Sequence, residues 1–159
     1  MVMELRGIKE LHKNARYRYE TTEEIIFEVE GMDVGKWDLY AAENGTIGRL
    51  IAKGRGNKVE VKPRFKWDGC TIIGNFYENE ITLRGSLLHD LLYVVAKNNN
   101  FKATFNLFQA DIWFRKYMLK EYKRQSIIPW LYYFGITFLG LPWKFGKNRG
   151  WLISDKVLD

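Results

Sequence analysis

The sequence predicts an α+β fold in which an N-terminal antiparallel sheet is followed by helices. Between Glu23 and Trp67, apolar and polar residues tend to alternate with a period of two, as in half-buried strands. From Leu83 onward, apolar residues recur at intervals of three and four, as in helices that bury one face. We therefore expect a β-meander of about four strands, then a helical hairpin and a third apolar helix.

Turn residues divide the first half into its expected strands. Asn44-Gly45 is a strong signal for a two-residue β-hairpin. The last segment is the clearest strand, and Pro63 within it has no N–H to donate, which favours an edge strand or a bulge. Its predicted inner face holds Val59, Val61, Pro63, Phe65 and Trp67. The four strands are expected within Glu23–Glu30, Lys36–Ala42, Ile47–Ala52 and Lys58–Trp67.

Three helical segments are expected in the second half. The first runs from Leu83 to the Asn98-Asn99-Asn100 run and is apolar on most sides. The second begins near Thr104, a plausible N-cap, and ends near Lys123. Its apolar stripe is expected to contain Leu107, Phe108, Phe114 and Met118.

The third helical segment, Ile127–Trp143, is a run of 17 uncharged residues. This length is at the lower limit for crossing a bilayer, and prolines and glycines interrupt the run, which favours a buried helix. Its Trp and Tyr residues would also suit a membrane interface, so peripheral membrane contact through 127–143 is the alternative.

Length and composition are consistent with one domain spanning residues 1–159. It would comprise a basic segment 1–20, the sheet 23–67, the helical part 83–143 and a tail 144–159. Cys70 is the single cysteine, so no intramolecular disulfide forms, and residues 1–18 lack the apolar core of a signal peptide. We expect residence in a reducing cytoplasm. The net charge of +6 is spread along the chain, which favours solvated basic faces over a nucleic-acid surface.

The residues with the strongest chemical potential are His89, Tyr93 and Asp111. On a helix, His89 and Tyr93 share a face one turn apart. Asp111 interrupts an apolar stripe, and a buried carboxylate must be paired. A helical hairpin would bring it to His89, where Nδ1 is the expected partner and the other nitrogen would become a general base toward water. A purely structural His–Asp pair is the alternative.

Two further acids are candidate ligands for a divalent cation, calcium or zinc. Asp90 projects about 100° away from His89 around the helix, so it could act as a separate ligand. Asp68, in the turn Asp68-Gly69, could supply another hard oxygen ligand. The alternative for Asp68 is a capped turn. We interpret Cys70 as a small core residue and His12 as a surface residue.

Three motifs in order resemble a family of small proteins encoded mostly by tailed phages and prophages. They are Phe65 to Thr71, which follows a Phe-x-x-Asp-Gly-Cys/Ala-Ser/Thr pattern, then His89 to Tyr93, then Ala110 to Phe114. The chain departs from the family at Ile72-Ile73-Gly74, where Val/Ile-Pro is usual. The resemblance implies a viral or prophage origin, in the host cytoplasm or associated with a virion, but it implies no activity.

The His-Asp-x-x-Tyr helix is also similar to that of phospholipase A2. In that family the histidine activates water, the adjacent aspartate binds calcium and a distant aspartate orients the histidine. The resemblance would make His89 the base, Asp90 the calcium ligand and Asp111 the orienting carboxylate, with Tyr93 hydrogen-bonded to the network. The chain differs in having no disulfides, no Gly-rich Tyr-Gly-x-x-Cys-Gly loop and a large β-meander.

Two classes of function follow. The first is a small phage-type hydrolase that acts on an ester, an amide or a cell-envelope component through His89, Asp90 and Asp111. The second is a non-enzymatic virion component or host-interaction protein, with a protein partner, in which the His–Asp pair only holds helices together. The sequence does not determine the oligomeric state.

Overall fold

The computed structural model describes residues 7–11, 18–43, 46–67, 69, 79–97, 104–122, 127–139 and 151–154. Its antiparallel sheets are followed along the chain by helices, which confirms the predicted α+β class. The strands are β1 (Ile8–Glu10), β2 (Tyr19–Thr21), β3 (Ile25–Glu28), β4 (Lys36–Glu43), β5 (Thr46–Arg55), β6 (Lys58–Val61), β7 (Lys66–Trp67) and β8 (Trp151–Ser154). The helices are α1 (Glu80–Lys97), α2 (Leu107–Glu121) and α3 (Ile128–Phe134), and α3 continues into the π-helical turn η2 (Gly135–Leu139).

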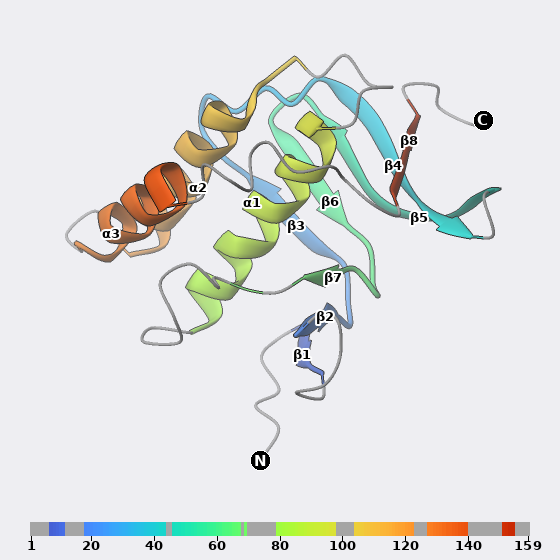
Figure 1. Cartoon of the computed structure of the whole chain (residues 1–159), viewed down its shortest axis with the longest axis horizontal. Coiled ribbons are helices and arrows are strands. Elements are labelled where there is room, and N and C mark those ends of the chain that lie inside the picture. Colours follow the sequence, from blue (N-terminus) through green and yellow to red (C-terminus); the bar gives the residue numbers. More distant parts are fainter. Residues whose placement is uncertain are drawn as a thin grey trace.

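The strands form two sheets. The larger has the order β3-β6-β5-β4-β8, and the smaller has the order β1-β2-β7. Strands β4, β5 and β6 follow one another as a meander, while β3 joins beside β6 and β8 pairs with the outer edge of β4 (Figure 1). Glu43 at the end of β4 pairs with Thr46 at the start of β5, so these two strands form the predicted antiparallel hairpin.

The segment predicted as one strand from Lys58 to Trp67 divides between the two sheets. β6 lies between β3 and β5, so the predicted edge position is wrong, and β7 pairs with β2 instead. The chain turns at Pro63-Arg64, where the missing N–H of Pro63 ends the ladder and Arg64 has a φ of 72°. Pro63 is exposed, contrary to prediction. The other four residues of the predicted inner face are buried, two before the turn and two after it: Val59, Val61, Phe65 and Trp67.

One hydrophobic core joins the sheets to the helices. Figure 1 shows α1 in front of the larger sheet, with α2 and then α3 on the side of β3. The Nε1–H of Trp67 donates to Ser86 Oγ at 3.0 Å, which links β7 to α1. The ring of Phe27 meets the ring of Tyr117 edge to face at 5.5 Å, which links β3 to α2. The helical hairpin therefore covers the inner side of the sheet.

The N-cap of α2 lies two residues later than the predicted N-cap at Thr104. Asn106 is the N-cap, because its side chain accepts from the backbone N–H of Gln109 at 3.0 Å and the Gln109 side chain accepts from Asn106 N–H at 2.8 Å. This register places Phe108 on the outer side, where it is 55% exposed, so its predicted place in the buried stripe is wrong. Phe114 and Met118 are buried as predicted.

The third helical segment is buried on one side only. Pro129 and Tyr132 face the core, while Ile127, Trp130, Leu131, Phe134 and Phe138 are exposed. The prediction of a buried helix is therefore wrong for that outer face, and residues 140–143 of the predicted segment lie outside the described part of the chain. Among the described helices, none combines the length and the apolar character needed to cross a bilayer.

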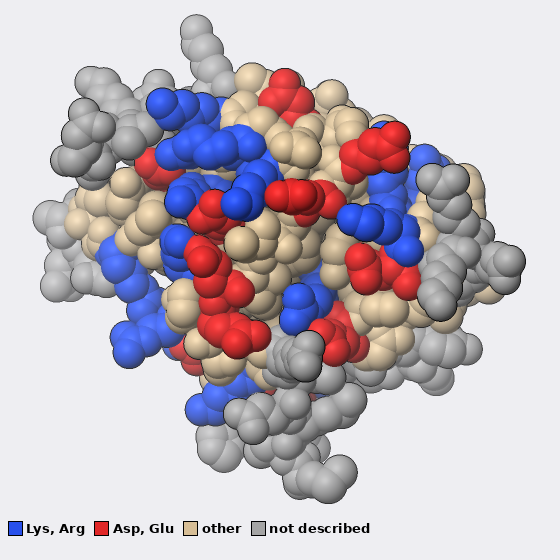
Figure 2. Space-filling model, turned by 180° about the vertical axis from the view of Figure 1, so that it is seen from behind, with Lys and Arg blue, Asp and Glu red and all other residues tan. Residues whose placement is uncertain are grey.

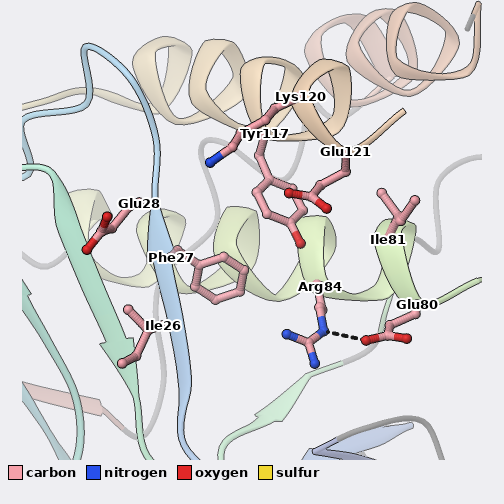
Figure 3. A pocket seen from close by; sticks show the side chains of 9 residues that line it. All are labelled: Ile26, Phe27, Glu28, Glu80, Ile81, Arg84, Tyr117, Lys120 and Glu121. Carbon is pink, nitrogen blue, oxygen red and sulfur yellow. Dashed lines mark ion pairs between the residues drawn. The ribbon is translucent and has the colours of Figure 1, made fainter. Parts of the chain in front are cut away.

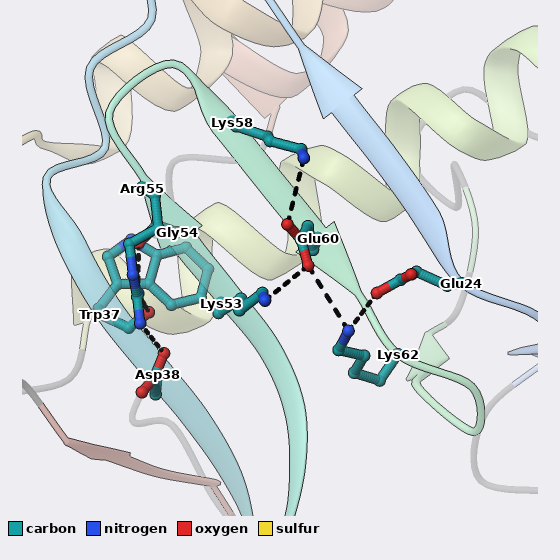
Figure 4. A network of polar contacts seen from close by, with 9 residues as sticks. All are labelled: Glu24, Trp37, Asp38, Lys53, Gly54, Arg55, Lys58, Glu60 and Lys62. Carbon is teal, nitrogen blue, oxygen red and sulfur yellow. Dashed lines mark hydrogen bonds and ion pairs between the residues drawn. The ribbon is translucent and has the colours of Figure 1, made fainter. Parts of the chain in front are cut away.

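Charged residues of both signs are interspersed on the back of the molecule (Figure 2). A close view shows how they pair (Figure 4). Glu60 on β6 lies 2.9 Å from Lys53, 3.3 Å from Lys58 and 3.5 Å from Lys62, and Lys62 also pairs with Glu24. These cations are therefore neutralised locally by carboxylates instead of forming a field of one sign.

This network predicts an acid sensitivity that Glu60→Gln removes. The hydrogen bond from Lys53 lowers the pKa of Glu60 to about 2, against a smaller opposing effect of burial and with further lowering by Lys58. The same carboxyl titrates near ~4.3 in an unfolded chain, so its stabilisation is complete above that pH and is lost as the pH falls toward 2. We expect the free energy of unfolding, measured with urea, to fall in both chains between pH 5 and pH 2. The fall should be smaller in Glu60→Gln than in the unmodified chain, by up to about 1 kcal/mol.

The matched control is Glu80→Gln, which removes a more exposed carboxylate that pairs with Arg84 one turn along α1. Between pH 5 and pH 2, the unfolding free energy of Glu80→Gln should fall by as much as that of the unmodified chain. Equal pH dependence in Glu60→Gln and the unmodified chain would contradict the role given to Glu60.

Candidate functional site

The predicted pair of His89 and Asp111 is present between α1 and α2. His89 Nε2 lies 2.9 Å from Asp111 Oδ1, and the two residues are 7% and 1% exposed. Tyr93 donates its hydroxyl proton to the same Oδ1 at 2.5 Å, and Thr137 Oγ1 donates to Oδ2 at 3.3 Å. The buried carboxylate thus has at least three partners, as its desolvation requires.

Helix geometry and one glycine position these side chains. His89 and Tyr93 lie one turn apart on α1, with ring centroids 4.1 Å apart. One turn before His89, a Cβ added to Gly85 would lie 2.8 Å from Met118 Sδ and 2.9 Å from Phe114 Cε2. Gly85 therefore permits the close approach of α1 and α2, and side chains of α2 fill the space beside it.

The nitrogen that binds Asp111 is Nε2, so the predicted role of Nδ1 is wrong. Nε2 is at the far end of the ring and reaches across the helix interface, whereas Nδ1 is nearer the backbone of α1. Nδ1 lies 3.3 Å from Oδ1 of Asp90, whose side chain is 37% exposed. Asp90 therefore turns toward the ring, and Nδ1 lies on the side of this partly exposed carboxylate.

The carboxylates favour the protonated forms of His89 and Tyr93. Burial lowers the pKa of His89, but the hydrogen bonds to Asp111 and Asp90 and the charges of both acids outweigh it, so the pKa lies above its ordinary value. Burial raises the pKa of Tyr93, and its hydrogen bond to Asp111 raises it further. His89 therefore lies between two carboxylates that favour its imidazolium form, and Tyr93 is a neutral phenol that donates to one of them.

The calcium or zinc role predicted for Asp90 and Asp68 stays a prediction. Asp68 lies outside the described residues, together with His12 and Cys70. Within the described ranges, no group of three or more His, Cys, Asp or Glu side chains could hold a metal ion.

Thr137 is a member of the network that the sequence analysis missed. It lies in η2 and connects the third helical segment to Asp111. One signal could have found it, because Thr137 is the only Ser, Thr, Asn or Gln in the uncharged run from Ile127 to Trp143. A single short polar side chain in such a run usually has a specific hydrogen-bond partner.

A pocket of about 470 Å³ lies away from this network, between β3, the start of α1 and the end of α2 (Figure 3). Neither His89 nor Asp111 lines it. Its acids and bases nearly balance, and Arg84 Nε pairs with Glu80 at 3.1 Å. The lining residues are Ile26, Phe27, Glu28, Glu80, Ile81, Arg84, Tyr117, Lys120 and Glu121. They come from three elements and share no sequence pattern, which is why the sequence did not indicate this pocket.

The network predicts that the imidazole of His89 titrates above ~6.5, its value in an unfolded chain. Because the folded pKa is raised, the stabilisation is complete below the unfolded value and is lost as the pH rises through the folded one. The chain has two histidines, so His12→Gln leaves His89 as the only source of imidazole NMR signals. We expect its Cε1–H resonance to titrate with a midpoint above pH 6.5. Adding Asp90→Asn to His12→Gln should lower this midpoint. A midpoint below 6.5 in His12→Gln would contradict this electrostatic description.

Comparison with known proteins adds no family assignment. No family model matches the chain, and neither a curated protein nor a solved structure matches it. The resemblances to the phage family and to phospholipase A2 thus rest on the motif residues of this chain. The hydrogen bonds around His89 and Asp111 are the structural observations that bear on function.

Proposed function

We propose that this protein is a small hydrolase in which His89 accepts a proton from water and Asp111 holds His89 in position. The proposal is carried by the hydrogen bond between Nε2 and Asp111. In the neutral ring this bond selects the tautomer that is protonated on Nε2, which leaves the lone pair on Nδ1. Nδ1 is also the nitrogen on the side of the partly exposed Asp90.

The reaction that fits this arrangement is the attack of water on an ester or amide carbonyl. Asp90 moves aside, Nδ1 takes a proton from the water, and the water oxygen bonds to the carbonyl carbon. The proton then passes from Nδ1 to the leaving alkoxide or amine as its bond to carbon breaks. The imidazolium formed between these steps is stabilised by Asp111 and Asp90, and Tyr93 keeps the Asp111 carboxylate in place.

A phage or prophage origin is part of the proposal. It is supported by the order of the three motifs, from Phe65 to Phe114, along the chain. A protein of that origin would work in the host cytoplasm or in a virion, where a cell-envelope ester or amide is an available substrate.

A second candidate function is a non-enzymatic virion component or host-interaction protein. It is favoured by the burial of His89, which is 7% exposed, and by the contact of both ring nitrogens with carboxylates. The network would then serve only to join α1, α2 and η2, with no free nitrogen for chemistry.

The proposal predicts that His89→Gln abolishes hydrolysis while the chain stays folded. Three probes cover the bond types: p-nitrophenyl acetate, phosphatidylglycerol vesicles and purified peptidoglycan, each from pH 7 to pH 10, with and without calcium or zinc. We expect at least one to be hydrolysed, and kcat to fall by about 10²- to 10⁴-fold in His89→Gln, the usual contribution of a general base. Asp111→Asn should also lower kcat, because it no longer fixes the tautomer.

The control is His12→Gln, which removes the other histidine and should leave kcat unchanged. Circular dichroism melts establish that each variant is folded. A folded His89→Gln variant with the original rate would remove the enzyme proposal. An unmodified chain inactive on all three probes, together with a lower melting temperature of His89→Gln, would support the structural pair instead.

A further inference from the structure

The outer face of α3 and η2 carries an apolar stripe on the surface. The exposed fractions are 69% for Ile127, 41% for Trp130, 50% for Leu131, 49% for Phe134 and 62% for Phe138. The residues recur at helical spacing, and the rings of Trp130, Phe134 and Phe138 stack in sequence at 6.1 and 6.0 Å. Large apolar side chains grouped on one exposed face indicate an interaction site.

The inner side of the same segment is anchored, so the stripe has a defined direction. Tyr132 is 1% exposed and its ring meets that of Phe114 at 6.4 Å. Thr137 donates to Asp111. Figure 1 shows α3 as the outermost helix, with α2 between it and α1. The stripe therefore faces away from the protein as a consequence of how the segment is held.

A cation borders the stripe. The Arg115 guanidinium lies 4.6 Å from the ring centres of both Trp130 and Tyr133. Lys116 and Lys120 of α2 lie toward β3 instead: Lys116 Nζ donates to the backbone oxygen of Glu30, and Lys120 lines the pocket beside Glu28. In the sequence, residues 127–139 contain no charge, and the first charged residues on either side are basic: Lys123 and Arg124 before the segment, and Lys144, Lys147 and Arg149 after it.

We propose that this stripe docks the protein on an anionic phospholipid bilayer, with α3 lying along the interface. Apolar and aromatic side chains would enter the boundary between headgroups and acyl chains, and Arg115 would contact phosphate. Charge complementarity favours this occupant, because uncharged aromatic rings bordered by basic residues match the layered polarity of an anionic membrane surface. The proposal does not depend on hydrolysis at His89.

Vesicle sedimentation tests this docking. The unmodified chain should sediment with vesicles of phosphatidylcholine and phosphatidylglycerol in equal parts, less with phosphatidylcholine alone, and less at high salt. Leu131→Ser combined with Phe138→Ser should lower partition into the mixed vesicles by at least about tenfold. The matched control is Ile26→Ser combined with Ile47→Ser, which removes apolar side chains exposed by 49% and 53% on the sheet and should leave partition unchanged.

Three results would overturn the proposal. The unmodified chain could fail to sediment with the mixed vesicles, or the stripe variant could sediment equally well. Sedimentation velocity could also show that the unmodified chain is an oligomer and that the variant with Leu131→Ser and Phe138→Ser is a monomer. In that case a second copy of the chain covers the stripe. Circular dichroism melts confirm that both double variants are folded, as expected for substitutions at exposed positions.

Discussion

The structure depends on one buried negative charge. Asp111 is 1% exposed on the apolar face of α2, and an ionised carboxylate in such surroundings is tolerated only when other groups satisfy it. Its partners come from two other segments, His89 and Tyr93 on α1 and Thr137 in η2. The carboxylate thereby determines the rotation of α1 against α2 and the position of the third helical segment.

The exposed apolar face of α3 and η2 and the position of His89 Nδ1 both follow from the hydrogen bonds to Asp111. With Tyr132 and Thr137 directed inward, the outward side chains of this segment are exposed although they are as apolar as the core: Ile127, Trp130, Leu131, Phe134 and Phe138. The same network places Nδ1 of His89 beside the partly exposed carboxylate of Asp90. A single buried contact thus links the proposed chemistry of α1 to the exposed stripe on α3.

Much of the fold could be predicted from local patterns. Alternation and turn residues indicated the β4–β5 hairpin, and apolar spacing indicated α1 and its end before Asn98. The pairing of His89 with Asp111 was predictable because a buried carboxylate needs a partner. The choice of Nε2 was not, because it depends on where the ring lies relative to α2. Period-two alternation also cannot distinguish a central strand from an edge strand, so the passage of the chain into the second sheet after Pro63 and the pairing of β8 with β4 were missed. On α3, exposed and buried residues are equally apolar, so the sequence pattern could not indicate which side of the helix is exposed.

A double-mutant cycle on the unfolding free energy tests the central claim most directly. The four chains are the unmodified protein, His89→Ala, Asp111→Ala and the double variant, unfolded with urea at pH 7. If Asp111 and His89 stabilise each other across the helix interface, the two single losses will not add, and the interaction energy will be at least about 1.5 kcal/mol. If the losses add to within about 0.5 kcal/mol, the two residues are independent and this account of the fold is wrong.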